Sequence, residues 1–295
     1  CDEDDHRGKV LRPAQKRAAI KAVIKQHGIS ARRACRLAGL SETSWYYRLK
    51  ADPANLAIRD RLRELAAERP AFGSPRMTVM IRREFGAINH KRVERLYGQE
   101  GLQLPRRPKR RRRGTHRIIP AEIPTAPGQR GSMDFAHDML ADGRRIRIFA
   151  LVDDYSRQCL ALEVDTSLSG QRISRVLGQV RETGQLPQVL VCDNGPEFTS
   201  RAMLMWSQRS ATRIHHIQPG KPTQNAYCES FIGKFRYECL RQHWFRSLLE
   251  ARAVIEQWRM DYNHVRPHRG LGQRTPMELV REAEKPENSH SEYSG

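Results

Sequence analysis

The sequence predicts an α/β fold over residues 129–280, a mixed sheet with flanking helices, preceded by small all-α modules. Before residue 129, apolar residues recur every three or four positions, which is typical of helices, and after it β-rich runs alternate with short turns. The charge changes at the same place, because residues 1–128 hold 30 Lys and Arg against 13 Asp and Glu, and residues 129–295 hold 23 against 20. The excess predicts a basic, nucleic-acid-binding front end joined to a nearly neutral domain.

Composition excludes several other classes of protein. The 295 residues carry a formal charge of +20 but no apolar run of about 18 residues, so no membrane partner is expected. No signal sequence is recognisable, which predicts a cytoplasmic protein. The six cysteines never fall in C-x-x-C spacing, so we expect reduced, mostly buried thiols and neither a disulfide framework nor a zinc site.

Residues 1–50 predict three short helices, at about 14–26, 31–38 and 42–48, separated by Gly28 and Gly39 and capped by Ser30 and Ser41. This order is typical of a helix-turn-helix, and a plain three-helix packing unit is the alternative. Thr43 and Ser44 lie in the exposed first turn of the third helix and are candidate DNA contacts.

Residues 51–104 predict a second helical DNA-binding module, with helices ending before Pro70, running from a cap at Ser74 to Phe85, and following a cap at Asn89. Lys91, Arg92 and Arg95 share one face of the last helix, which suits phosphate contacts. A solvated basic face is the alternative.

Residues 105–128 predict an extended basic, Pro-rich linker that follows a DNA groove, with salt-dependent binding; a nuclear-localisation signal is the competing interpretation. Its candidate DNA contacts are Arg106, Arg107, Lys109, Arg110, Arg111, Arg112 and Arg113. At the other end of the chain, the polar residues 281–295 are expected to be disordered.

The domain over 129–280 is predicted to begin with a three-stranded antiparallel meander and to continue with βαβ elements. The strands are expected at 131–139, 145–153, 158–165, 188–192 and 212–218, and the helices at 169–184, 199–208, 225–240 and 248–262.

Three carboxylates are the candidate catalytic and metal-binding residues: Asp134 within the first strand, Asp193 at the end of the fourth, and Glu229 on the helix expected at 225–240. Residues 194–228, 35 in number, separate the last two. All-oxygen ligands suit Mg²⁺, with Mn²⁺ as a substitute, and two such ions can support in-line phosphoryl transfer. Arg236 shares a helix face with Glu229 and would clamp a phosphate, and Lys234 and Asn225 on the same segment are further candidate DNA contacts.

Taken singly, each acid has an ordinary structural interpretation. Asp138, Asp153, Asp154 and Glu197 compete for the site, and we expect Glu197 to cap the following helix and Asp153 and Asp154 to shape a turn. His215 and His216 point to opposite faces of a strand, so they are not expected to share one metal ion.

The choice among these acids rests on a family resemblance. Ser-Met-Asp-Phe at 132–135, Asp-Asn-Gly-Pro-Glu-Phe at 193–198 and Asn-Ala-Tyr-Cys-Glu-Ser-Phe-Ile-Gly-Lys-Phe-Arg at 225–236 resemble motifs of the bacterial insertion-sequence transposases (the OrfB or OrfAB type) of the retroviral-integrase-like DDE superfamily. The segment 261–276 and the blocks at 72–73 and 89–93 are also similar, except that Phe72 stands where the family usually has tyrosine.

The resemblance implies an RNase H-like catalytic fold (the integrase catalytic core), Mg²⁺ dependence, and cleavage and strand transfer at the terminal inverted repeats of an insertion sequence. It also implies double-stranded DNA partners (element ends and target), a homo-oligomer of at least two copies on DNA, and a place in the bacterial cytoplasm with the nucleoid. Arg266 and His268 fall in a loop expected to touch DNA.

Two other functions stay open at this point: an RNase H-like structure-specific nuclease that does not join ends, and a catalytically idle DNA-binding repressor of the element. The chain begins with Cys1 and lacks leucine heptads, so we expect it to lack the further helix-turn-helix and coiled coil that begin full-length family members.

Overall fold

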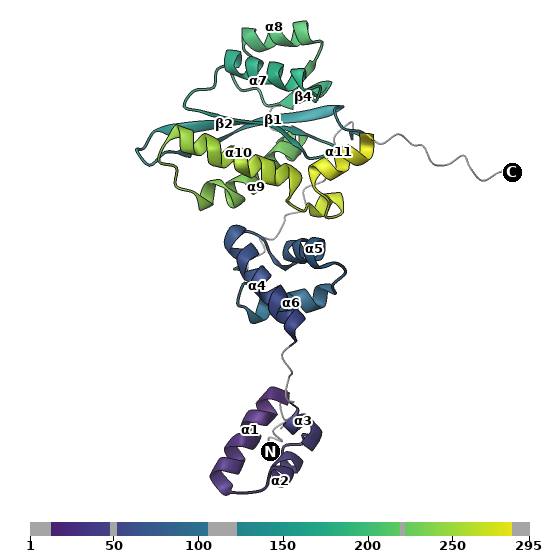
Figure 1. Ribbon diagram of the computed structural model, residues 1–295. Coiled ribbons are helices and arrows are strands. Elements are labelled where there is room, and N and C mark those ends of the chain that lie inside the picture. Colours follow the sequence, from purple (N-terminus) through teal and green to yellow (C-terminus); the bar gives the residue numbers. More distant parts are fainter. Residues whose placement is uncertain (1–12, 48–51, 106–122, 219–221, 285–295) are drawn as a thin grey trace, which may run out of the picture. The chain divides into compact units, whose positions relative to one another are not determined.

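The computed structural model describes residues 13–47, 52–105, 123–218 and 222–284 (Figure 1). It divides between Ala57 and Ile58 into two compact units. No helix in these ranges is long and apolar enough to cross a membrane.

The first unit holds three helices, α1 (Pro13–His27), α2 (Ala31–Leu37) and α3 (Glu42–Tyr46). The hydroxyls of Ser30 and Ser41 accept N–H bonds from the first turns of α2 and α3, which confirms both caps. Its small core gathers around Ile20, Ala34 and Cys35.

Three more helices, α4 (Pro53–Glu68), α5 (Ser74–Phe85) and α6 (His90–Gln99), pack around a second core that includes Leu62, Met77 and Leu96. Asn89 caps α6, as expected. The cap of α5 is Gly73 and not Ser74, because Ser74 already has helical geometry and Pro75 takes the second helical position.

A five-stranded mixed sheet forms the centre of the second unit. Its strands are β1 (Arg130–Met139), β2 (Arg145–Asp153), β3 (Cys159–Asp165), β4 (Val189–Cys192) and β5 (Arg213–His216), in the order β3-β2-β1-β4-β5. The first three strands pair antiparallel, and β4 and β5 add in parallel beyond β1. The predicted meander and βαβ continuation are therefore confirmed.

Helices cover both faces of this sheet (Figure 1). On one face lie α7 (Gly170–Glu182) and α8 (Arg201–Ser210), over a core that includes Met133, Phe149 and Leu151. On the other lie α9 (Ala226–Glu238) and α10 (Leu248–His264), over Ala136, Ile148 and Ala150. Alternate residues of β1 and β2 thus supply the two cores, as strand geometry requires.

Short elements complete the domain. The 3₁₀ turn Pro222–Asn225 leads into α9, the turns Leu240–Gln242 and Arg269–Leu271 flank α10, and α11 (Pro276–Glu284) ends the described chain. Residues 281–284 are therefore helical, which corrects the expectation of a tail starting at residue 281. Residues 285–295 and the basic run 106–113 lie outside the described residues.

From Ile58 onward, the α4–α6 helices share one compact unit with the sheet domain. Arg76 of α5 forms an ion pair with Glu238 of α9, and Arg69 pairs with Asp261 of α10. Five cysteines lie in the described ranges, and all five are buried free thiols, as expected.

Candidate active site

Asp134 lies in the middle of β1, on the face that α9 covers. Its neighbours Met133 and Phe135 point into the core under α7 and α8, whereas Ala136 joins the core under α9 and α10. Alternation along the strand puts Asp134 on the α9 side. The side chain is half-buried, and its Oδ1 accepts the N–H of Phe135 at 2.7 Å.

Asp193 follows the last residue of β4, beside β1. The parallel register pairs Gly131 with Leu190 and Ser132 with Val191, and the pairing ends there. Continued by two residues, this register places Asp134 level with Asp193. The site therefore forms where the two strands cease to pair, at the carboxyl end of β4, which is a usual ligand position in open α/β sheets.

The turn that carries Asp193 is held by hydrogen bonds of its own. The N–H of Gly195 donates to Asp193 Oδ1 at 2.9 Å, and a Cβ on Gly195 would lie 3.0 Å from that oxygen, so a larger residue would displace the carboxylate. Asn194 Nδ2 donates to the carbonyl of Ile217 at 2.9 Å, and a ring nitrogen of His216 lies 3.1 Å from the carbonyl of Asp193. β5 thus supports the end of β4.

Two side chains farther along anchor this turn on the sheet. Phe198 is buried and stacks on Phe135 with ring centroids 5.1 Å apart. Glu197 forms an ion pair with Arg147 of β2, whose guanidinium lies 4.3 Å from the centre of the Phe135 ring. Glu197 was expected to cap α8, but the cap is Ser200, whose hydroxyl accepts the N–H of Met203.

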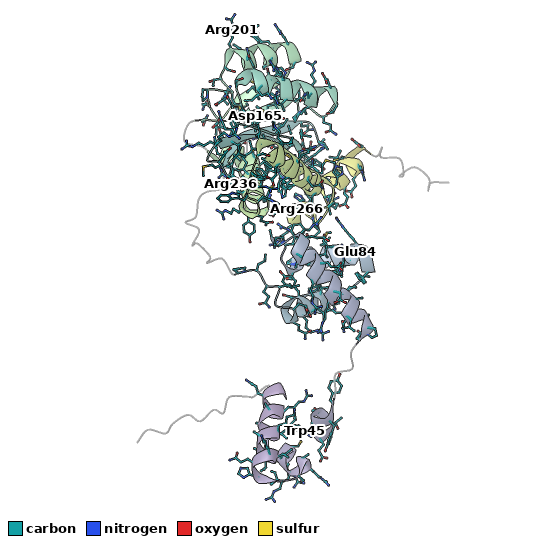
Figure 2. The ribbon with its side chains drawn as sticks, turned by 60° about the vertical axis from the view of Figure 1, so that its left-hand side comes forward. Trp45, Glu84, Asp165, Arg201, Arg236 and Arg266 are labelled. Atoms are coloured by element: carbon teal, nitrogen blue, oxygen red, sulfur yellow. The ribbon has the colours of Figure 1, made fainter. Side chains whose placement is uncertain are left out.

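Glu229 lies in the first turn of α9, and both it and Arg236, two turns later, are exposed. Figure 2 labels Arg236 on this helix. The opposite side of α9 is anchored by Cys228, Phe231 and Phe235, which are buried against β2 and α10.

The charges of these groups interact. Burial, together with the charges of Asp193 and Glu229, raises the pKa of Asp134 from 3.8 to about 6, whereas the N–H of Phe135 and the charge of Arg236 oppose the shift. The charges of Asp193, Glu229 and Arg236 therefore all act on the carboxyl of Asp134. Within the described ranges, no three His, Cys, Asp or Glu side chains converge closely enough to hold a metal ion.

Lys234 lies half-buried on α9. Burial, reinforced by the charges of Arg266 and Arg157, lowers its pKa from 10.5 to about 8. The side chain is still mostly protonated at neutral pH, and its contact with DNA remains a prediction.

The prediction that Arg266 and His268 contact DNA from an open loop is wrong, because both are buried. Arg266 is 2% exposed and donates two bonds of 2.6 Å to Glu238. His268 is 5% exposed and packs edge-on against Tyr262, and burial lowers its pKa to about 2, which keeps the ring neutral.

Asn225 is also buried, at 3% exposed, so it does not present its amide to DNA as predicted. Its Nδ2 donates to the carbonyl of Met133 at 2.9 Å, the residue before Asp134.

The candidate contacts on the helical modules have mixed positions. Thr43 is exposed, whereas the hydroxyl of Ser44 bonds that of Ser41 within the cap of α3. On α6, Lys91 and Arg95 are exposed and Arg92 is half-buried, while Val93, Leu96 and Tyr97 face the core. The shared basic face is therefore present, and its contact with phosphate stays a prediction.

Sequence reasoning missed the supports of the acids: Asn225 beneath Asp134, and Arg147 and His216 beside the Asp193 turn. For Asn225 and His216, the only feature in the sequence that could have indicated this role is their position in or near a motif. Arg147 lies on β2, far from the Asp193 turn in the sequence, and no local pattern indicates its pairing with Glu197.

An antiparallel meander extended by two parallel strands and covered by helices on both faces is the architecture of an integrase-type catalytic core, a class of polynucleotidyl transferases. The family description "Integrase core domain" matches residues 124–222 and 210–276, and "HTH-like domain" matches residues 53–110. The helix-turn-helix match thus falls on α4–α6, and the assignment of that motif to residues 1–50 remains a prediction.

Relatives narrow this class. The chain is 43% identical over 275 residues to an uncharacterized 39.2 kDa protein of insertion element IS476 from Xanthomonas euvesicatoria, covering 93% of this chain and 79% of the relative. It is 44% identical to an IS407 protein of Burkholderia multivorans (88% and 94% covered), and 24% identical to the putative transposase InsK of IS150 from Escherichia coli K12 (82% and 90%). The chain belongs to the insertion-sequence transposases of the integrase superfamily.

Among solved structures, the chain is similar to the catalytic core domain of HTLV-2 integrase, with 14% identity, a TM-score of 0.43, and 53% of this chain and 98% of that one covered.

Proposed function

We propose that this transposase cleaves and joins DNA strands at the terminal inverted repeats of its insertion sequence, with Asp134, Asp193 and Glu229 as the catalytic, metal-binding acids. The observation that carries the proposal is the register of β1 and β4, which continues to bring Asp134 level with Asp193. The start of α9, one turn before Glu229, is bonded to the same strand through Asn225. Like charges brought together at a half-buried position are costly unless a cation neutralises them.

These residues fit Mg²⁺ by their chemistry, since the donors are all carboxylate oxygens. Asp193 and Glu229 are exposed, and Asp193 Oδ1 accepts the N–H of Gly195. In this structure the three carboxyls stand apart. Two Mg²⁺ ions, or Mn²⁺ in their place, would supply Lewis-acid activation of the scissile phosphate and of the attacking hydroxyl.

The other residues of the site orient the DNA. Arg236 faces the same side of α9 as Glu229, so its guanidinium is placed to hold a phosphate oxygen next to the acids. Lys91 and Arg95 on α6 and Thr43 on α3 are exposed and would contact DNA outside the catalytic core. We propose that the active form is a homo-oligomer of at least two copies on double-stranded DNA.

A strand-transfer assay tests this function. The purified chain is incubated with pre-cut DNA carrying the inverted repeats that flank its coding sequence, a target plasmid and Mg²⁺. Asp193→Asn and Glu229→Gln should each abolish joining, whereas Glu182→Gln, an exposed acid at the end of α7, should leave it unchanged.

Three results would contradict parts of the proposal. Joining that persists in the Asp193 or Glu229 variant would remove the assigned role of that acid. Cleavage without joining by the unaltered protein would indicate a nuclease, and binding to the ends without either reaction would indicate a repressor.

A further inference from the structure

Asn225 connects the strand that carries Asp134 to the helix that carries Glu229. It stands at the N-terminus of α9, one helical turn before Glu229, and its Nδ2 reaches the carbonyl of Met133 at 2.9 Å. We propose that Asn225 is a positioning residue that sets the spacing between these two acids for metal binding. This inference rests on the proposed function and assigns a role that the three acids cannot perform themselves.

Because the side-chain amide of Asn225 bonds to Met133, it does not cap its own helix, as asparagine usually does at a helix N-terminus. Asparagine is a favoured N-cap because its side chain accepts an N–H of the first turn. Here Asn225 occupies the N-cap position of α9 and makes no side-chain cap bond. Its amide points to β1 and not along its own helix.

The side-chain oxygen of Asn225 indicates that the residue does more than stabilise the fold. Asn225 Oδ1 is buried and has no hydrogen-bond partner among the residues that the structure describes. An unsatisfied buried oxygen costs about 1–3 kcal/mol, and an apolar residue of the same shape would avoid that cost. The N–H bond to Met133 is therefore retained together with a local penalty, as is common at functional sites.

The bond acts at the point where the sheet stops holding β1 in place. Pairing between β1 and β4 ends at Ser132, and Met133 and Asp134 come next. A second bond joins the same junction, from Arg130 of β1 to the carbonyl of Gln224 at 2.9 Å. Adjacent residues of the turn before α9 thus bond to β1 on the approach to Asp134.

The spacing between Asp134 and Glu229 is important because a metal ion must contact both carboxylates. Mg²⁺ requires oxygens at about 2.0–2.1 Å in nearly ideal octahedral geometry. The carboxylate of Glu229 is exposed and can rotate, whereas that of Asp193 accepts the N–H of Gly195. The backbone positions of β1 and α9 therefore set how far Glu229 must reach. Loss of the Asn225 bond would let the helix start shift relative to Asp134 and weaken the site.

The test measures Mn²⁺ binding to the full chain by isothermal titration calorimetry, together with the thermal unfolding midpoint. Asn225→Leu keeps the side-chain shape but removes the bond, and we expect the Mn²⁺ affinity to fall about tenfold or more, as for other residues that orient metal ligands. Excess Mn²⁺ should restore the strand-transfer rate, since the acids themselves are intact.

Asn263→Leu is the matched control. Asn263 is 1% exposed and its Nδ2 donates to the carbonyl of Cys159 at 2.9 Å, so it makes a bond of the same kind away from the acids. This variant should lower the unfolding midpoint and leave the Mn²⁺ affinity unchanged. If Asn225→Leu does not fold, Asn225→Ser carries the same expectation, because its hydroxyl is too short to reach Met133.

Wild-type Mn²⁺ affinity in a folded Asn225 variant would overturn the inference. So would an equal loss of Mn²⁺ affinity in Asn263→Leu, because the effect would then be one of general stability. Failure of the proposed function looks different: Asp134→Asn and Glu229→Gln would then bind Mn²⁺ as tightly as the unaltered chain.

Discussion

The ionised carboxylate of Asp134 destabilises the folded protein, and this effect should be measurable without DNA. Its pKa in the folded protein, about 6, lies above the ordinary value of 3.8 because of burial and the charges of Asp193 and Glu229. A raised pKa means that the folded state binds the proton more tightly, so this contribution to stability is present below about pH 4 and is lost as pH rises through 6.

Asp134→Asn should therefore stabilise the metal-free protein at pH 8 and have little effect near pH 4. The shift of about two units corresponds to about 3 kcal/mol, and partial exposure of the carboxyl reduces the expected gain to about 1 kcal/mol. Thermal unfolding in chelator across this pH range measures it. Identical unfolding midpoints for the unaltered protein and Asp134→Asn at pH 8 would contradict the prediction that the ionised Asp134 destabilises the fold.

Glu238 is the second residue with a sharp expectation. It is buried and pairs with buried Arg266 and with Arg76. Glu238→Gln leaves the Arg266 charge buried without a counter-charge, which should cost about 3 kcal/mol in the free energy of unfolding. Glu256→Gln, which breaks an exposed pair with Arg259, should cost less than about 1 kcal/mol in the same denaturant titration.

A small effect of Glu238→Gln, equal to that of Glu256→Gln, would mean that Arg266 finds another partner or water.

At the scale of elements, helix caps and strand alternation were the sequence features from which the helices and strands could be predicted. Ser30, Ser41 and Asn89 cap helices as expected, because a cap bond is made within three residues and leaves a local signature. The three-stranded meander followed from turn length and alternation in the same way. These parts of the fold could therefore be predicted from interactions that are short in sequence.

The environment of the acids could not be predicted so well, because it depends on contacts between distant segments. Arg266 and His268 have the chemistry of DNA contacts, but α9 and α10 bury them. Glu197 lies just before a helix and was expected to cap it, yet it pairs with Arg147, 50 positions upstream in the chain. Residue type indicates what a side chain can do, and tertiary packing decides which partner it meets.

The Asp193 turn gives a prediction for one element. Glu197→Ala removes the pair with Arg147 and should loosen the turn, so strand transfer is expected to fall about tenfold while stability changes by less than about 1 kcal/mol. Glu163→Ala is the matched control, since Glu163 pairs with Arg172 at 2.6 Å away from the turn and should leave the rate unchanged. Equal rates for both variants would show that the turn is held without the pair of Glu197 and Arg147.

At the scale of the whole molecule, the α4–α6 helices belong with the sheet domain. They were expected to form a separate module, but contacts join them to α9 and α10, including the pairs of Arg69 with Asp261 and of Arg76 with Glu238. A cavity of about 530 Å³ lies between them, lined by residues such as Phe72 and Trp258.

Truncation tests this arrangement. A chain beginning at Asp52 should unfold in one transition at the temperature of the corresponding transition in the full chain. A chain beginning at Pro105 should unfold at a lower temperature, because Asp261 loses Arg69, Glu238 loses Arg76, and the apolar surface around Trp258 becomes exposed. Equal midpoints for the two fragments, measured by calorimetry, would show that the helices contribute nothing to the domain.

The alternation of β1 has a consequence for how this gene can change. Met133 and Asp134 occupy opposite sides of one ten-residue strand. One codon inserted between positions 130 and 133 would reverse every side chain beyond it, turning the carboxylate into the apolar layer under α7. Two codons would restore the facing but move the acid out of level with Asp193. Insertions or deletions of residues just before Asp134 should therefore damage the site more than most substitutions at the same positions.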